Sequence, residues 1–254
     1  MYRFFVDKNQ IGPKSVVITG SDVNHIKNVL RMKEGEEVSV MTEGDTNEYR
    51  CEVAVLGEDT VELTLLFVKE SDVELSCKIT LFQGLPKNDK MELIIQKAVE
   101  LGASAIVPVA TKRAVVKLDG AKENKKIARW QGISEAAAKQ SKRAYIPEVS
   151  NVMNMKEALA AIRDYEVKLI PYEMCDADSM IKTKELISNI KPNDRVAVFI
   201  GPEGGFTEEE IELAKEAGVI PITLGHRILR TETAGFTVLS WIMYEVESSN
   251  AGIS

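Results

Sequence analysis

The sequence has little cysteine, little histidine and no long apolar run, and these shortages exclude several classes of protein. The three cysteines, Cys51, Cys77 and Cys175, are odd in number and far apart, which excludes a CxxC metal site and a disulfide framework. No apolar run has the length of a membrane span, and the first residues lack the layout of a signal peptide. We therefore expect a cytoplasmic protein with no metal and no membrane partner.

The sequence also lacks the common glycine loops that hold nucleotide phosphates. No GxGxxG follows an early predicted strand, so a nicotinamide dinucleotide site has little support. The glycine-rich segment 201–205 lacks the G-K-[ST] ending of a P-loop. Pro202 removes one backbone N–H donor from this segment, and the carboxylate of Glu203 would repel a phosphate. These absences count against a transferase or oxidoreductase that uses a nucleotide.

Charge is unevenly distributed along the chain. The formal net charge is −7, but residues 112–145 hold ten Lys and Arg against three acids, so this stretch carries +7 and the rest −14. Residues 1–35 are also basic, with six Lys and Arg against three acids. Localised basic surfaces on an acidic protein are suited to selective docking on a polyanion. The plainer alternative is a solvated helical face.

The first seventy residues read as short strands separated by turn residues. Strands are expected at 3–6, 15–19, 38–41, 49–56 and 60–68. Between the second and third, Ser21 caps a predicted helix over 21–31 whose apolar residues recur on one face. This pattern predicts a small β-barrel with one helix.

From about residue 75 strands alternate with helices. The expected strands are 77–83, 105–111, 167–172, 196–200 and 219–224, and the expected helices are 88–101, 122–142, 177–189, 207–218 and 233–246. Gly102 is placed to end the first of these helices, and Thr207 with Glu210 forms a capping box at the start of the fourth. The alternation predicts a mostly parallel sheet covered by helices.

Two glycine-bearing segments, 201–205 and 225–235, each follow a predicted strand near the C-terminus. Ligands of open α/β sheets bind beyond the carboxyl ends of such strands. A tight backbone beside a carboxylate suits a flat, partly cationic ligand, such as a nucleoside bearing a sulfonium. The alternative is that Gly205 and Gly235 are simple turn glycines.

The same segments carry a family resemblance. Gly201-Pro-Glu-Gly-Gly-Phe and Leu224-Gly-x-x-Ile-Leu-Arg-x-Glu-Thr-Ala closely resemble the paired signature of the SPOUT-class methyltransferases, specifically the RsmE family, which methylates N3 of a uridine in small-subunit (16S) ribosomal RNA. Segments 25–31, 96–102 and 135–143, the last followed by Pro147, match the family's N-terminal motif, first long helix and basic helix. The likeness covers the whole chain.

The resemblance implies a fold, a cofactor and an assembly. It implies a PUA-like, RNA-binding β-barrel domain over 1–70, followed over 74–250 by an α/β SPOUT domain with a C-terminal trefoil knot. It also implies a homodimer, with S-adenosylmethionine bound in the knot. The residues that it assigns to the cofactor are Ile170, Pro171, Ile200, Gly201, Glu203, Gly204, Leu224, Gly225, Ile228, Leu229 and Arg230.

Methylation of uridine N3 requires loss of a proton or stabilisation of the uracil anion. Arg230 is the first candidate to stabilise charge on the uracil oxygens or to hold an adjacent phosphate; its alternative role is an ordinary ion pair. Glu232 and Glu203 are candidate bases, although Glu232 also suits a helix N-terminus and Glu203 also suits backbone N–H donors. His226 has a suitable ordinary pKa but is more typical of a bystander. The general base stays unassigned.

Seven basic residues are expected to contact ribosomal RNA: His25, Lys27, Arg31, Arg113, Lys139, Lys142 and Arg143. Phosphate contacts of this kind give affinity and salt dependence but little sequence choice. Apolar residues of the last predicted helix, such as Trp241 and Tyr244, are more typical of a core or a dimer interface. Two alternatives remain: a ribosome-assembly factor that binds RNA without catalysis, and a SPOUT methyltransferase acting on a different RNA base.

Overall fold

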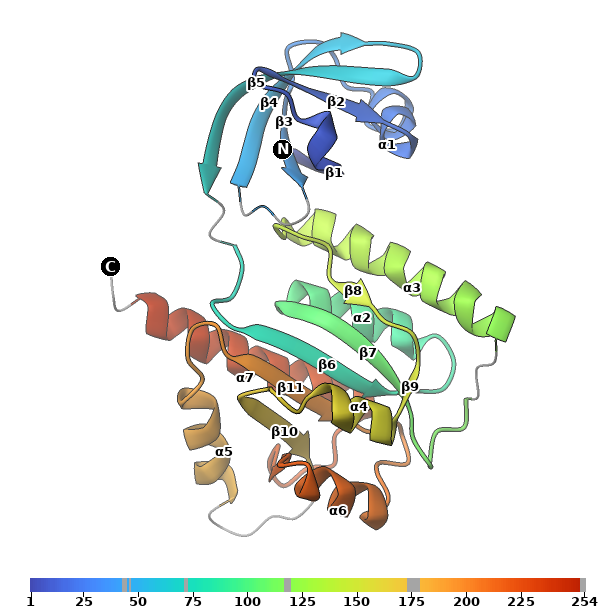
Figure 1. The fold of residues 1–254 in the computed structure, drawn as a ribbon, viewed down its shortest axis with the longest axis vertical. Coiled ribbons are helices and arrows are strands. Elements are labelled where there is room, and N and C mark those ends of the chain that lie inside the picture. Colours follow the sequence, from blue (N-terminus) through green and yellow to red (C-terminus); the bar gives the residue numbers. More distant parts are fainter. Residues whose placement is uncertain (43–44, 46, 71–72, 117–119, 173–178, 252–254) are drawn as a thin grey trace. The chain divides into compact units, whose positions relative to one another are not determined.

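The computed structural model describes residues 1–254 except 43–44, 46, 71–72, 117–119, 173–178 and 252–254 (Figure 1). The chain divides into two units. Unit 1 comprises Met1–Glu74 and Ala138–Ile146, and unit 2 comprises Leu75–Ala137 and Pro147–Ser254. Residues 138–146, which lie inside the predicted second domain, therefore group with unit 1.

Unit 1 is built on a five-stranded, curled sheet (Figure 1). Its strands are β1 (Tyr2–Val6), β2 (Ser15–Thr19), β3 (Glu37–Thr42), β4 (Asn47–Leu56) and β5 (Thr60–Glu70), in the order β1-β3-β4-β5-β2. β1 pairs with β3 in parallel, and the other pairs are antiparallel. Alternate residues of these strands, such as Val16 and Ile18, form the buried core. The five predicted strands are confirmed within two residues.

The predicted helix over 21–31 is confirmed as a helical path over 21–29, but its second half is not an α-helix. The chain forms α1 (Ser21–Asn24) and then continues as a π-helix, η2 (His25–Val29), so the expected i,i+4 pattern is lost. Ile26 is buried against the sheet, whereas His25 is exposed. At Arg31 the backbone has φ 53°, the left-handed region, which ends the helical path. A short 3₁₀ helix, η1 (Lys8–Gln10), precedes β2.

Unit 2 contains a seven-stranded sheet in which every strand pair is parallel, as the alternating pattern predicted. The strands are β6 (Lys78–Gly84), β7 (Ala103–Ala110), β8 (Glu148–Val149), β9 (Met153–Asn154), β10 (Val167–Pro171), β11 (Arg195–Ile200) and β12 (Ile220–Ile222). Their order is β12-β10-β11-β6-β7-β8, with β9 also paired to β7. The central strands are buried on both faces, and Phe82 stacks on Phe199 with ring centroids 4.5 Å apart.

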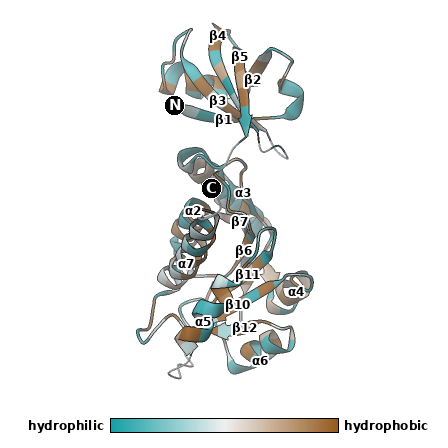
Figure 2. Cartoon of the chain, turned by 90° about the vertical axis from the view of Figure 1, so that its left-hand side faces the viewer, coloured by the Kyte–Doolittle hydropathy of each residue, from teal (hydrophilic) through white to brown (hydrophobic). Residues whose placement is uncertain are grey.

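Helices cover both faces of this sheet. They are α2 (Lys90–Glu100), α3 (Gly120–Ser141), α4 (Met155–Ala161), α5 (Ser179–Ser188), α6 (Glu208–Glu216) and α7 (Thr231–Ala251). α2 and α7 lie together on one face, and α4 and α6 lie on the other (Figures 1 and 2). The capping box predicted for Thr207 and Glu210 is present. α4 was not predicted, and α7 begins at Thr231 rather than near Thr233.

The strand order explains where a site can form in unit 2. β12, β10, β11 and β6 are successive neighbours and all point the same way, so their carboxyl ends meet at one edge of the sheet. The segments that leave this edge follow Gly84, Pro171, Ile200 and Ile222. Both glycine-bearing segments found in the sequence are therefore brought to the same edge.

Candidate functional site

The first glycine segment, 201–205, forms a closed turn directly after β11. The N–H of Gly205 donates to the carbonyl of Pro202 at 2.9 Å, and Gly205 has φ +66°, a conformation that favours glycine. A Cβ on Gly201 would lie 3.0 Å from the Cα of Gly205, so the turn closes on itself too tightly for a side chain there. The glycines thus fix the backbone of this segment.

The second glycine segment leaves β12 through Thr223. The N–H of Gly225 donates to Thr223 Oγ1 at 3.2 Å, and the N–H of Thr223 donates to Thr183 Oγ1 of α5 at 3.2 Å. Gly225 has φ +97°, which a side-chain-bearing residue rarely adopts. The segment is therefore held by α5 at its start. Further on it becomes exposed, and Ile228 has 83% of its surface accessible.

A buried hydrogen-bond chain joins the two segments. Gln83, the penultimate residue of β6, donates from Nε2 to Thr231 Oγ1 at 2.9 Å, and Thr231 donates to the carbonyl of Gly201 at 2.6 Å. Thr231 is the first residue of α7, so this chain ties β6, the first glycine segment and α7 together. Gln83 is fully buried, and its Oε1 has no hydrogen-bond partner among the residues that the structure describes. Neither Gln83 nor Thr231 was identified from the sequence. The available local signal for Gln83 was that it is a lone glutamine in a mostly apolar strand.

Lys90 links two carboxylates at the same place. Its ammonium, at the start of α2, lies 3.1 Å from Glu203 Oε1 and 3.4 Å from Glu232 Oε2. Hydrogen bonding to Glu203, with the charges of both carboxylates, raises the pKa of Lys90. Sequence reasoning missed Lys90 because it is far from both carboxylates along the chain. The group of one cation and two anions leaves this part of the site with a net negative charge.

Glu203 is held as a structural acceptor. Its carboxylate also accepts the backbone N–H of Lys87, at 3.2 and 3.3 Å. Burial acts to raise the pKa of Glu203, but hydrogen bonds from its own backbone, from Lys90 and from Lys87 outweigh it, so the pKa is lowered. These contacts match the alternative role given to Glu203 and make it a poor proton acceptor.

Arg230 and Glu232 lie at the entrance to α7. Arg230 is exposed, and its guanidinium has no hydrogen bond or ion pair among the described residues, while its carbonyl accepts the N–H of Ala234 at 2.8 Å. Glu232 is in the first turn of the helix. Its Oε2 is buried and has the ion pair to Lys90 but no hydrogen bond within the described part of the chain. Arg230 is therefore a cation at this edge that is available to a ligand.

The other residues predicted for the cofactor take different positions. The side chains of Ile170 and Ile200 are buried in the core of unit 2, so only their backbone faces the sheet edge. Pro171, Leu224 and Leu229 are half-buried, and Gly204 is exposed. The residues predicted to bind the cofactor therefore lie at one edge of the sheet, and most of them present backbone atoms there.

Six of the seven residues predicted to contact RNA belong to unit 1, and Arg113 belongs to unit 2. His25, Arg31 and Lys142 are exposed. Lys27 donates to the carbonyls of Gly57 and Glu58, at 2.6 and 3.3 Å. Lys139 pairs with Asp22 at 3.1 Å. These last two cations are partly engaged within unit 1.

Arg143 does not lie on the predicted RNA surface. It is only 3% exposed, and its guanidinium lies 2.7 Å from Glu74 and 5.0 Å from the centre of the Tyr145 ring. Lys142 has φ 60°, which ends α3 and turns the following residue inward. Arg143 thus fastens residues 138–146 to unit 1, and we remove it from the RNA-contacting set.

Arg113 is the predicted RNA contact that lies against the candidate site. It donates from Nη1 to the carbonyl of Gly204 at 2.9 Å. A Cβ on Gly204 would lie 3.2 Å from the Cβ of Arg113, so this glycine also gives room to the arginine. The neighbouring backbone N–H of Lys112 donates to buried Glu210 at 2.8 Å. Residues 112–113 are thereby fixed beside the first glycine segment.

Two family models match the chain. An RNA methyltransferase domain matches residues 73–243, and an RNA methyltransferase PUA domain matches residues 18–66. Among curated relatives, Ribosomal RNA small subunit methyltransferase E of Bacillus subtilis is 38% identical over 97% of this chain and 98% of its own. The protein of the same name from Mesomycoplasma hyopneumoniae is 36% identical over 94% and 98%.

Solved structures agree with this grouping. A putative methyltransferase of Legionella pneumophila in complex with the cofactor SAM is 31% identical with a TM-score of 0.83, covering 96% of this chain and 97% of that one. A Ribosomal RNA small subunit methyltransferase E of Neisseria gonorrhoeae bound to S-adenosyl methionine is 32% identical with a TM-score of 0.82, at the same coverage of 96% and 97%. Within the described residues no helix is both long enough and apolar enough to cross a membrane.

Proposed function

The chain belongs to the RsmE family of ribosomal RNA small subunit methyltransferases, and from this premise we propose that it transfers a methyl group from S-adenosylmethionine to N3 of a uridine in 16S ribosomal RNA. The observation that carries the proposal is the joining of segments 201–205 and 225–235 at one sheet edge through Gln83, Thr231 and Gly201. Both relatives whose structures contain the cofactor align over nearly the whole chain.

The residues at this edge fit a sulfonium nucleoside. Gly201 and Gly204 let the first glycine turn pack tightly on itself and on Arg113, which fixes the backbone that we propose as one wall for a flat ligand. Lys90 is shared by the carboxylates of Glu203 and Glu232, which place negative charge beside the first glycine segment, where a sulfonium would be favoured. We propose that the backbone of 200–204, 224–225 and 228–230, with the ends of β10 and β11 as walls, holds the cofactor in a trefoil knot.

When bound, the cofactor supplies a methyl group on a sulfonium. The chain then has to orient uracil, stabilise its anion and accept the N3 proton. We assign anion stabilisation to Arg230, whose guanidinium has no partner among the described residues. We propose Glu232 as the acceptor of the N3 proton in preference to Glu203, because Lys90 pairs with both carboxylates but only Glu203 also accepts the backbone N–H of Lys87.

We propose two separate RNA contacts: the exposed cations of unit 1, and Arg113 on unit 2. His25, Arg31 and Lys142 are free to meet phosphates, and Lys27 and Lys139 can exchange their present partners for them. We further propose a cytoplasmic homodimer. On α7, Tyr244 is 70% exposed, and on neighbouring α2, Leu93 is 44% exposed, so this face offers apolar surface to a second copy. Light scattering of the wild type and of Tyr244→Glu tests the dimer.

The decisive experiment is to map modified nucleosides in 16S ribosomal RNA from cells that lack this protein. The proposal expects one N3-methyluridine to disappear and to return with the wild-type gene. Its persistence would exclude the substrate. Loss of a different methylated base would show the same chemistry on another target. Calorimetric titration with S-adenosylmethionine separates both from an assembly factor without catalysis, which would not bind millimolar cofactor.

A further inference from the structure

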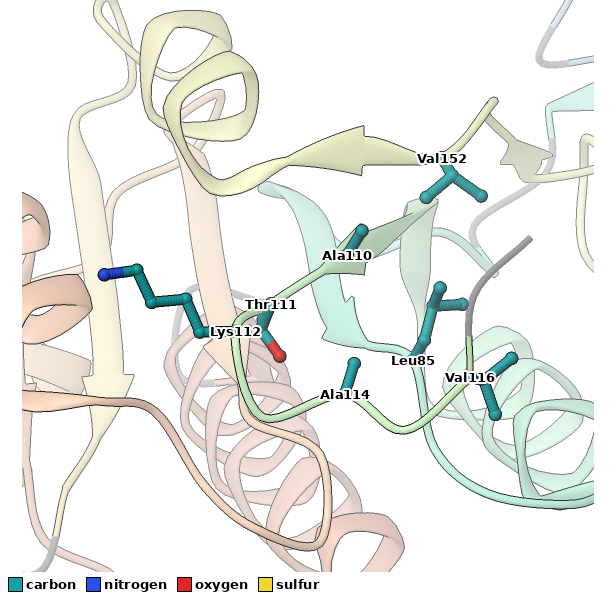
Figure 3. Close-up of a pocket in the computed structure, with 7 residues that line it drawn as sticks. All are labelled: Leu85, Ala110, Thr111, Lys112, Ala114, Val116 and Val152. Atoms are coloured by element: carbon teal, nitrogen blue, oxygen red, sulfur yellow. The ribbon is translucent and has the colours of Figure 1, made fainter. Parts of the chain in front are cut away.

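A hollow lies in unit 2 beside the carboxyl ends of β6, which also supplies Gln83 to the proposed cofactor site, and of β7. It is a cavity of about 470 Å³ beside the carboxyl ends of β6 and β7 (Figure 3). Leu85 follows β6 directly, Ala110 ends β7, and Val152 precedes β9. Its volume falls in the range of small-ligand sites, about 300–1,000 Å³.

The lining is apolar with one unmet polar group. Leu85, Ala110, Ala114, Val116 and Val152 supply hydrocarbon walls. The polar members are Lys112, whose ammonium already pairs with Glu209, and Thr111. Thr111 is only 7% exposed, and its Oγ1 has no hydrogen-bond partner among the described residues. A buried hydroxyl without a partner is unusual in a native protein, and a ligand with a polar edge would satisfy it.

The cavity adjoins the proposed cofactor site through a fixed segment. Residues 110–116 contribute most of the lining, and within them Arg113 donates to the carbonyl of Gly204 at 2.9 Å. The N–H of Lys112 is held by Glu210 at 2.8 Å. A molecule in this cavity therefore lies on the segment that also braces the first glycine turn. None of the seven lining residues is acidic, so the cavity does not suit a cationic amino-acid group.

We propose that this cavity receives an unstacked nucleobase of the ribosomal RNA substrate. A base has an apolar face for the hydrocarbon walls and a polar edge for the hydroxyl of Thr111. Its phosphates remain outside, where the guanidinium of Arg113 is exposed. The inference rests on the proposed function, because it takes RNA as the substrate. It adds a base-binding site formed by the β7 end to the phosphate contacts of unit 1.

The test compares two leucine substitutions in neighbouring residues. Ala114→Leu narrows the cavity with a larger lining side chain, whereas Val115→Leu places leucine at a position that is 67% exposed and outside the lining. Each variant is titrated with small ribosomal subunits purified from cells that lack this protein, and separately with S-adenosylmethionine. Ala114→Leu should weaken subunit binding at least about tenfold, and Val115→Leu less than about twofold, with cofactor affinity unchanged in both. Equal subunit affinity of the two variants would overturn the inference.

Thr111→Val keeps the test valid if Ala114→Leu fails to fold. It preserves side-chain shape and removes the hydroxyl, so it should weaken subunit binding about fivefold. Unchanged binding would overturn the role of Thr111. A change in molecular mass confined to Ala114→Leu would instead assign the cavity to an interface between two copies of this chain. Because these readouts are binding constants, they stand apart from the proposed methyl transfer, whose failure would appear as unmodified 16S ribosomal RNA with wild-type protein.

Discussion

The Arg113 guanidinium donates a 2.9 Å hydrogen bond to the carbonyl oxygen of Gly204. One arginine thereby connects a segment predicted to meet RNA with a turn predicted to hold the cofactor. The remaining donors of the guanidinium have no protein partner among the described residues and stay available to a phosphate. RNA binding and cofactor binding are expected to be coupled through this contact.

Replacing Arg113 by methionine should therefore weaken both ligands. Loss of one charge-assisted hydrogen bond corresponds to about 1.5 kcal/mol, or roughly tenfold in cofactor affinity, and loss of the cation also lowers RNA affinity. Calorimetry with S-adenosylmethionine and titration with small ribosomal subunits measure the two effects. The control is Lys112→Met, whose ammonium pairs with Glu209 and not with the glycine turn. If cofactor affinity is the same in both variants, the bracing role of Arg113 is wrong.

Arg230→Ala should separate catalysis from binding. The guanidinium is exposed and unpaired within the described chain, so its loss should leave the melting temperature unchanged. Turnover should fall by about 10²–10³-fold if it stabilises charge that develops on uracil. Arg227→Ala, an exposed arginine on the same segment, is the matched control. Equal losses of turnover in the two variants would contradict the assignment.

Lys90→Met should leave Glu203 and Glu232 without their shared cation, and we expect turnover to fall about tenfold. Lys90 helps to lower the pKa of Glu203, so in this variant Glu203 is protonated more easily and the acid limb of the pH–turnover profile should move to higher pH. Lys90→Arg should restore the profile. Lys97→Met removes a lysine paired with Glu100 on the same helix and serves as the control. An unmoved acid limb would reduce Lys90 to a structural role.

Local signals in the sequence sufficed for most elements but not for contacts between distant segments. The capping box of Thr207 and Glu210 predicted the start of α6. Asn154 and Glu157 form the same motif before α4, so this missed helix was also predictable. The role of Lys90 was not predictable from the sequence. Its partners Glu203 and Glu232 come near it only after β6 and β11 have paired in the sheet and α7 has packed in the folded unit.

Stability at acid pH should depend on Glu166. Hydrogen bonds from the side chain and then the backbone of Arg195 lower the pKa of Glu166 from its ordinary value of 4.5 to about 2. A folded-state pKa below the unfolded value stabilises fully above pH 4.5, and this contribution is lost as the pH falls towards 2. Glu166→Gln should therefore flatten the fall in melting temperature over this window. Glu212→Gln, at an exposed position of α6, should keep the wild-type slope of melting temperature against pH; the same slope in Glu166→Gln would contradict the linkage.

Arg143 and Lys142 are adjacent cations in the sequence, but Arg143 is buried and Lys142 is exposed on the surface. Arg143 is buried against Glu74, so Arg143→Ala leaves an unpaired carboxylate and should destabilise unit 1 by about 3 kcal/mol. Lys142 is exposed, and its replacement by alanine should cost little stability. In RNA titrations over a range of salt, Lys142→Ala should reduce the salt slope by about one, and Arg143→Ala should leave it unchanged while the protein stays folded. The reverse pattern would return Arg143 to the RNA surface and show that its contact with Glu74 opens when RNA binds.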